Sequence, residues 1–325
     1  MTPPPFLFVV GCGRSGTSVL RTVLDAHPDL AVAWEGRFVA PLGLRRARYE
    51  RTDGFATDRL VADLLADRAV RTNLELGEGD LRAALADPGP ADFPDAVRRV
   101  FAHWAATRGK ARYGDKFPGY VLRMDLLAGM FPEARFVHIV RDGRDVALSS
   151  MAIQPEDAVA MALNWRSRVT AGREAGARLG HVRYQEVHYE TLVTDPEPVV
   201  EGLCDFLDLT YDPAMLAFPG RKGGVPGKLA ANPRHARLAE PLSPGARSWR
   251  RDMDPADVAA FEAVAGDLLA DCGYERATDH PRASARARAA WGRTRWQFTR
   301  ATARLPGAAR RTVRREDQGQ VQPRP

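Results

Sequence analysis

Long apolar runs, cysteine and lysine are all scarce in this chain of 325 residues. No run of 18 or more apolar residues occurs, which predicts that no helix spans a bilayer. Residues 1–5 (MTPPP) contain neither a basic segment nor a small-residue cleavage site, so no signal peptide is expected. The three cysteines, Cys12, Cys204 and Cys272, are too widely spaced for a zinc site or a disulfide framework. These absences favour a reducing, cytoplasmic compartment.

Positive charge is unevenly distributed along the chain. The formal net charge is +6, yet residues 281–325 hold twelve Arg against two acids, so residues 1–280 are net negative. This distribution argues against a nucleic-acid-binding core. Only four of the 47 basic residues are lysine, and a lysine in so Arg-rich a chain is a candidate for a role that needs an ammonium group. These residues are Lys110, Lys116, Lys222 and Lys228.

Apolar runs of strand length alternate with segments of helical periodicity. The runs predict strands at 6–10, 30–33, 135–140 and 182–187. Helical spacing predicts helices at 17–26, 120–130, 158–177, 198–207 and 255–272. Such alternation is typical of an α/β fold with a central parallel sheet and helices on both faces. We expect residues 1–280 to form one domain, in which about 45–112 are a helical insertion covering one face.

The C-terminal segment has a different character. Trp291, Phe298 and Leu305 recur every seven residues with Arg on the other side, which predicts a basic amphipathic helix at 281–305. Such a helix can lie on an anionic membrane surface, pack on the core or contact another chain, and the sequence leaves these three alternatives open. Residues 306–325 are expected to be disordered.

A glycine-rich loop follows the first predicted strand. Residues 11–18 (GCGRSGTS) nearly match the phosphate-binding pattern G-x-x-x-x-G-K-[ST], but Thr17 replaces its lysine. Backbone N–H groups and the start of the next helix would still attract an anion. Arg14 supplies a planar cation at the loop tip, where it can bind two oxygens at once. The missing lysine argues against a nucleoside-triphosphate hydrolase or kinase.

Several motifs together resemble one known family. They are residues 13–29 (GRSGTSVLRTVLDAHPD), 115–118 (DKFP), 140–149 (VRDGRDVALS), 189–192 (YETL) and 246–249 (ARSW). The chain resembles the sulfotransferases that use 3'-phosphoadenosine 5'-phosphosulfate (PAPS), most closely the branch of the tyrosylprotein sulfotransferases, over roughly residues 6–275. The resemblance implies a P-loop-like three-layer fold, PAPS as donor, and transfer of its sulfuryl group to an acceptor hydroxyl.

The resemblance also implies roles for individual residues. The 5'-phosphosulfate would be held by Arg14, Ser15, Gly16, Thr17 and Ser18. The 3'-phosphate would be held by Arg141 and Ser149, with Tyr189 near the nucleotide.

For catalysis, Glu35 is expected to be the general base and Arg37 to lie on the acceptor side. Lys116 and Arg14 would stabilise the charge that develops on the leaving phosphate and the sulfuryl oxygens. The sulfuryl group bears less charge than a terminal phosphoryl group, so no metal is expected. Histidines are the alternative candidates for the general base, but His27 is more consistent with a helix cap and His138 with a core position.

The chain departs from the family pattern at several positions. Trp34 stands where the branch has the first of two acids, and Ile153 with its uncharged neighbours lacks an expected basic ligand of the 3'-phosphate. Ser248 stands where a lysine precedes the tryptophan, and the candidates to substitute for it are Arg247, Arg250 and Lys228.

Two other functions remain open at this stage. One is a P-loop kinase of a small molecule or nucleotide, and the other is a non-catalytic nucleotide-fold protein that binds membranes or partners through its basic tail. The acceptor could be a carbohydrate, lipid, metabolite or peptide, because acceptor pockets are built from variable insertions. No nucleic acid is expected as a partner.

Overall fold

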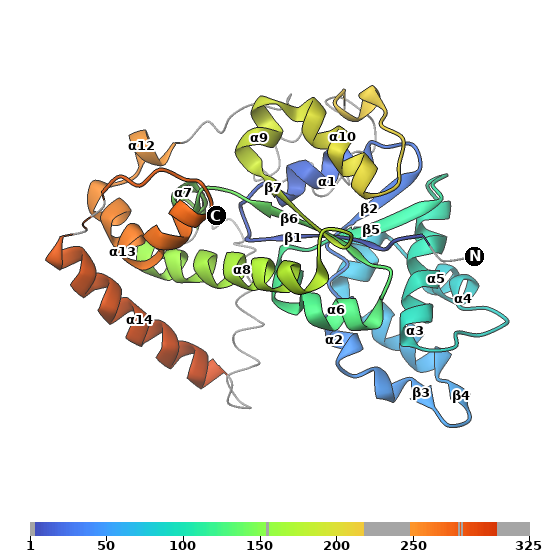
Figure 1. Ribbon diagram of the computed structural model, residues 1–325. Coiled ribbons are helices and arrows are strands. Elements are labelled where there is room, and N and C mark those ends of the chain that lie inside the picture. Colours follow the sequence, from blue (N-terminus) through green and yellow to red (C-terminus); the bar gives the residue numbers. More distant parts are fainter. Residues whose placement is uncertain (1–3, 154–155, 218–247, 279, 281, 304–325) are drawn as a thin grey trace, which may run out of the picture. The chain divides into compact units, whose positions relative to one another are not determined.

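The computed structural model describes residues 4–153, 156–217, 248–278, 280 and 282–303 (Figure 1). The chain divides into two compact units. The first consists of residues 1–141 and 168–246, and the second of residues 142–167 and 247–325. The single domain expected at 1–280 stays a prediction.

The first unit is built on a five-stranded sheet in which every pairing is parallel. The strands lie in the order β2-β5-β1-β6-β7 (Figure 1). They are β1 (Leu7–Gly11), β2 (Leu30–Trp34), β5 (Arg112–Lys116), β6 (Arg135–Val140) and β7 (Tyr184–His188). The predicted α/β fold with a central parallel sheet is therefore confirmed. The apolar pattern misses only β5 among these strands, because its sequence RYGDK is mostly polar.

Side chains along β1, and the residue before it, alternate between two helical layers. Phe6, Phe8 and Val10 enter one apolar cluster, whereas Leu7 and Val9 enter another. The helices with buried side chains in the Leu7 cluster are α1 (Thr17–Asp25), α9 (Tyr189–Thr194) and α10 (Pro196–Phe206). Those in the Phe6 cluster are α2 (Val39–Gly43), α3 (Thr57–Ala66), α4 (Glu78–Ala84), α5 (Phe93–Ala106), α6 (Met124–Met130) and α8 (Ala158–Leu179). The sheet is thus the middle of three layers.

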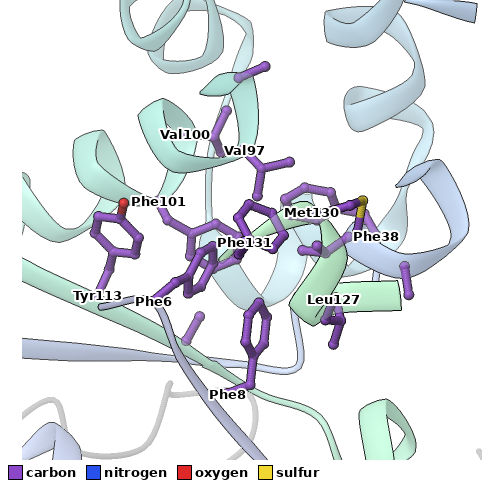
Figure 2. Packing of buried hydrophobic residues seen from close by; sticks show 14 of the residues in the cluster. Phe6, Phe8, Phe38, Val97, Val100, Phe101, Tyr113, Leu127, Met130 and Phe131 are labelled. Carbon is purple, nitrogen blue, oxygen red and sulfur yellow. The ribbon is translucent and has the colours of Figure 1, made fainter. Parts of the chain in front are cut away.

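Aromatic rings dominate the cluster on the Phe6 face (Figure 2). Phe6 stacks on Phe8 with ring centroids 4.4 Å apart. It meets Phe101 and Phe131 closer to edge-on, at 5.0 and 5.1 Å, a geometry that the charge distribution of aromatic rings favours. Because Phe101 lies on α5, the stretch predicted as a helical insertion forms part of the main core.

The same stretch also contains shorter elements that the sequence pattern does not indicate. Between α2 and α3 lies an antiparallel pair, β3 (Glu50–Arg51) and β4 (Gly54–Phe55). Short helical segments occur here and elsewhere, namely η1 (Arg46–Arg48), η2 (Val70–Leu74), η3 (Pro118–Arg123) and η4 (Pro213–Met215). The helices α3 to α5 still account for most of residues 57–106, as the alanine-rich pattern predicts.

Among the described residues of the second unit, all regular elements are helices. Besides the start of α8, it contains α7 (Gly143–Met151), α12 (Trp249–Asp252), α13 (Pro255–Asp271) and α14 (Ala283–Ala303). The last of these falls where the sequence predicts a basic amphipathic helix at 281–305. The segment 306–325, expected to be disordered, lies outside the described residues.

The covered side of α14 is not the one that carries Trp291. Ala285 and Ala289 are buried, and Gly292 lies so close to Val159 of α8 that a Cβ atom there would come within 2.3 Å of it. Trp291, by contrast, is 69% exposed. Small residues allow a close approach of the backbone, so they, rather than the tryptophan, form the docking side. Packing on the unit therefore leaves the Trp291 side available, and membrane contact through it stays a prediction.

A buried arginine holds the second unit together. Arg144 makes two hydrogen bonds to the Asp142 carboxylate, at 3.0 and 2.7 Å, and one to Glu262 at 2.5 Å. Its guanidinium group also lies 3.6 Å from the ring centre of Trp249. Asp145 accepts a hydrogen bond from the Trp249 backbone N–H at 2.8 Å. Although Arg144 and Asp145 belong to the motif at 140–149, both have structural partners here.

Loss of the buried pair is expected to destabilise the protein strongly. Glu262→Leu would leave the Arg144 charge partly uncompensated in the interior, which costs about 3–5 kcal/mol in other buried pairs. Urea denaturation followed by circular dichroism measures the free energy of unfolding. Asp267→Leu on the same helix is the matched control, because its pair with Arg166 is solvent-exposed and should contribute about 1 kcal/mol or less. Equal losses in both variants would contradict the structural role of Arg144.

Candidate active site

The glycine-rich loop joins the end of β1 to the start of α1. Gly11 lies against β6, where a Cβ atom would come within 2.6 Å of the Ile139 carbonyl oxygen. Gly16 has a φ of 94°, and a Cβ atom there would come within 2.3 Å of the Tyr189 ring. Between them Arg14 is also in the left-handed region, with a φ of 71°. Only a chain with glycine at both ends can make so tight a loop, which leads into the start of α1.

Hydroxyl groups line the start of α1. Ser15 is 1% exposed and Thr17 4% exposed, while Ser18 is partly buried. The Ser15 hydroxyl oxygen has no hydrogen-bond partner among the described residues. An unsatisfied buried hydroxyl costs about 1–3 kcal/mol, which an anion bound at the loop would recover. This observation fits an oxyanion at the loop independently of the motif.

Arg141 connects the loop to the end of the neighbouring strand β6. It follows β6, and its guanidinium carbon lies 4.4 Å from the ring centre of Tyr189. Its Nη1 atom lies 3.4 Å from the carbonyl oxygen of Arg14, to which it donates. The same Tyr189 ring packs on Gly16. Four residues that the resemblance assigns to the donor, Arg14, Gly16, Arg141 and Tyr189, are therefore in contact in the first unit.

Parallel strand order explains why these distant residues meet. Gly11 of β1 pairs with Ile139 of β6, and Val140 of β6 pairs with His188 of β7. The carboxyl ends of parallel strands lie at one edge of a sheet, which is where ligands of such folds bind. On the other side of β1, Lys116 at the end of β5 pairs with Val9.

A second charged cluster forms where β2 and β5 end. The Glu35 carboxylate accepts a hydrogen bond from Lys116 Nζ at 2.9 Å and one from Arg37 Nε at 3.0 Å, and Arg37 also donates to it through Nη2. Lys116 is 1% exposed, and its Nζ atom lies 4.3 Å from the ring centre of Trp34. Arg37 is less buried and lies over the ring of Phe117 at 5.0 Å. The structure thus brings together Glu35, Arg37 and Lys116, three of the four residues expected to perform or support catalysis, while the fourth, Arg14, lies in the glycine-rich loop.

Burial and ion pairing act in opposite directions on these groups. Burial raises the pKa of Glu35, but the charges of Lys116 and Arg37 and their hydrogen bonds outweigh it and hold this pKa at about 2. Burial lowers the pKa of Lys116, and the Glu35 carboxylate partly offsets that effect. The carboxylate is therefore ionised at neutral pH, as a general base must be, while its two cationic partners restrain its basicity.

Other residues named from the sequence have varied placements. Ser149 lies on α7 of the second unit, so its contact with a 3'-phosphate stays a prediction. Lys222 and Lys228 lie outside the described residues. His138 is a buried core residue whose Nδ1 atom lies 2.7 Å from the Tyr184 hydroxyl, and burial lowers its pKa to about 4.

Sequence reasoning missed one neighbour of the site. Asn73 of η2 donates from Nδ2 to the carbonyl oxygen of Glu35 at 3.2 Å. An asparagine in a segment without a recognisable motif offers no signal from which this contact could be expected. Its position depends on the fold of the insertion.

No group of three or more His, Cys, Asp or Glu side chains that could hold a metal ion occurs among the described residues. Within the same part of the chain, no helix is long and apolar enough to cross a membrane.

Comparison with protein families and curated proteins identifies relatives. A family model described as "Sulfotransferase family" matches residues 5–213. The chain is 27% identical to protein-tyrosine sulfotransferase 1 of Danio rerio over 287 residues, which cover 85% of this chain and 74% of the relative. It is 24% identical to the protein-tyrosine sulfotransferase of Drosophila melanogaster, over 85% of this chain and 53% of the relative. Nodulation protein NoeE of Sinorhizobium fredii is 25% identical, with 87% of this chain and 69% of that protein covered.

Among solved structures, the sulfotransferase domain from the Synechococcus PCC 7002 olefin synthase matches with a TM-score of 0.57. It is 23% identical, and the match covers 84% of this chain and 96% of that domain. The likeness supports the three-layer fold. The chain spans about half the length of the Drosophila relative. The match therefore does not assign the activity of that whole protein to this chain.

Proposed function

The chain belongs to the sulfotransferase family of enzymes, and we propose that it moves a sulfuryl group from PAPS to an acceptor hydroxyl. The observation that carries this proposal is the pairing of two anion-attracting groups in the first unit. The loop at 11–18 has the unsatisfied Ser15 hydroxyl and Arg14, and Arg141 contacts that loop from the neighbouring strand. A donor with phosphate groups on both its 5' and 3' sides needs two such groups.

The residues at the loop fit this donor. Arg14 presents a charged fork, α1 begins at Thr17 with free backbone N–H groups, and Ser15 has a hydroxyl to donate. Arg141 and Ser149 would hold the 3'-phosphate, and Tyr189 would lie near the nucleotide. When bound, PAPS supplies the sulfuryl group and carries away the charge that its departure creates.

The chain's own residues would perform the remaining steps. Glu35 would accept the proton of the acceptor hydroxyl at a carboxylate oxygen, with Arg37 orienting the carboxylate from the acceptor side. Lys116 would place its ammonium group beside the developing negative charge. Lys116 has three N–H donors, so sharing its charge with an anion would weaken its hold on Glu35 and restore part of that carboxylate's basicity.

The acceptor is proposed here only as a molecule with a hydroxyl group. The named relatives act, by their names, on protein tyrosine. Carbohydrate, lipid, metabolite and peptide acceptors are distinguished by incubation with labelled PAPS and representatives of each class.

Binding of nucleotides separates the proposed donor from that of a kinase. We expect calorimetry to show that 3'-phosphoadenosine 5'-phosphate binds at least about tenfold more tightly than ATP, because a charged hydrogen bond to the 3'-phosphate contributes about 1.5–3 kcal/mol. ATP also lacks its usual lysine partner here, since Thr17 occupies that position. A preference for ATP would favour the small-molecule kinase, and binding of neither would favour a non-catalytic protein.

A further inference from the structure

The segment that presents Glu35 is a turn in an unfavourable backbone conformation. Glu35 and Arg37 have φ angles of 56° and 57°, in the left-handed region that residues with a side chain rarely adopt. Residues in such regions cost on the order of 1–3 kcal/mol each and persist only when surrounding contacts hold them. Asp115 makes the most direct contact with the middle of this turn.

Asp115 lies directly beneath the centre of the turn. Its Oδ1 atom accepts a hydrogen bond from the Gly36 backbone N–H at 2.9 Å. A Cβ atom on Gly36 would lie 2.8 Å from Asp115 Oδ2, so the backbone rests on the carboxylate. Asp115 Oδ2 accepts a hydrogen bond from the Tyr120 hydroxyl, also at 2.9 Å, and this bond fixes the orientation of the carboxylate. Asp115 and Tyr120 are 0% and 1% exposed.

Burial of the Asp115 carboxylate costs free energy that a neutral hydrogen-bond acceptor for the Gly36 N–H group would not. No ion pair to Asp115 occurs among the described residues, and burial raises its pKa to about 6 against the lowering effect of its two hydrogen bonds. Burying a charge without a partner is unfavourable. An amide or a carbonyl oxygen could accept the same hydrogen bond at less cost, so the site retains a stronger acceptor than packing alone requires.

Alternation along β5 explains how one strand holds the turn from both sides. Consecutive residues of a strand point to opposite faces, so Asp115 and Lys116 diverge. Asp115 holds the Gly36 backbone, whereas Lys116 holds the Glu35 carboxylate through Nζ and the Glu35 backbone N–H through its carbonyl oxygen at 2.9 Å. With Asn73 on the Glu35 carbonyl, the turn is restrained at every peptide group that flanks the base.

We infer that Asp115, locked by Tyr120, is a positioning residue that fixes the Glu35–Arg37 turn and so places the Glu35 carboxylate beside Lys116. This inference rests on the proposed function for its kinetic consequence, but its structural part does not. Asp115 touches no reacting group and acts only through the backbone of Gly36.

Variants of Asp115 and Tyr120 should lower kcat in a defined order. Asp115→Ala removes the acceptor, and we expect kcat to fall about 10²-fold, the loss typical of a misplacement of about 1 Å. Asp115→Asn keeps an oxygen for the Gly36 N–H and should restore most of the activity. Tyr120→Phe should have an intermediate effect. Tyr113→Phe is the matched control, because Tyr113 is buried two residues earlier on the same face of β5 and does not reach the turn.

Two further readouts distinguish positioning from general stability. The dissociation constant of 3'-phosphoadenosine 5'-phosphate should stay within about twofold in Asp115→Ala, since the donor loop is not involved. In the same variant the Glu35 carboxylate should leave Lys116, so its pKa should rise from about 2 toward its ordinary value, as measured by ¹³C NMR titration of labelled glutamate. Thermal unfolding reports the structural cost separately.

The inference is overturned if Asp115→Ala is merely less stable, with kcat and the Glu35 titration unchanged in the folded protein. It is also overturned if affinity for the nucleotide falls in parallel with kcat. If the wild-type protein transfers no sulfuryl group to any acceptor, the proposed function fails, and the titration of Glu35 still decides the positioning role.

Discussion

Glu35→Gln is expected to lower kcat by about 10²- to 10⁴-fold, the range that removal of a general base produces. Gln has nearly the same shape and keeps an oxygen that can accept from Lys116 and Arg37. It cannot take a proton from the acceptor hydroxyl. Steady-state kinetics with labelled PAPS measures this loss.

Affinity for 3'-phosphoadenosine 5'-phosphate should stay within about threefold in the same variant, since Glu35 does not contact the loop at 11–18. Glu133→Gln provides the matched control. Glu133 is also a mostly buried glutamate in a bidentate pair with an arginine, Arg98, but it precedes β6 and so lies away from the carboxyl edge of the sheet. Turnover by Glu35→Gln at the rate of this control would remove the base assignment.

Replacement of the two arginines should weaken nucleotide binding in different ways. Arg14→Ala is expected to weaken the binding of both 3'-phosphoadenosine 5'-phosphate and adenosine 5'-phosphate by about 10²-fold, because each carries the 5'-phosphate. Arg141→Ala should weaken binding of the bisphosphate by a similar factor and bind adenosine 5'-phosphate much as before. Calorimetry measures the affinity of the wild-type protein and of both variants for each of the two nucleotides, and these affinities form a complete thermodynamic cycle.

The cycle assigns each arginine to one phosphate. Arg178→Ala is the control, because this arginine forms an exposed ion pair with Asp125 on the surface of the first unit. It should change neither affinity by more than about twofold. If Arg141→Ala weakened the binding of both ligands equally, Arg141 would support the loop through its contact with the Arg14 carbonyl rather than bind a 3'-phosphate.

Predictions from the sequence succeeded where a local pattern reflects a local cause. The apolar runs at 6–10 and 135–140 are strands because parallel strands buried on both faces need continuous apolar residues. The glycines at 11 and 16 indicated a tight loop, and both positions indeed have no room for a Cβ atom.

The strand β5 shows where such reasoning fails. Its residues include Gly114, Asp115 and Lys116, which are rare in buried strands, yet all three are buried. Asp115 and Lys116 are tolerated there because each has hydrogen-bond partners from the Glu35–Arg37 turn or η3. No propensity could reveal those partners, which lie some 80 positions away or arise from a segment without a motif.

The C-terminal helix shows what periodicity leaves open. Its seven-residue spacing predicted a basic amphipathic helix that could contact a membrane, the core or another chain, and in the structure Ala289 and Gly292 face the rest of the unit while Trp291 does not. Periodicity identifies which side of a helix is apolar, and only the shape of the opposing surface decides which side fits.

By itself, the sequence determined the parallel α/β architecture and the tight glycine loop, because each is encoded in residues close together along the chain. The family resemblance named the candidates Arg14, Glu35, Lys116 and Arg141. The tertiary structure alone decided that Glu35 pairs with Lys116, that Arg141 and Tyr189 meet the loop, and that Arg144 is a structural residue. These contacts depend on the strand order β2-β5-β1-β6-β7 and on helix packing, which join segments whose separation in sequence carries no information about their distance in space.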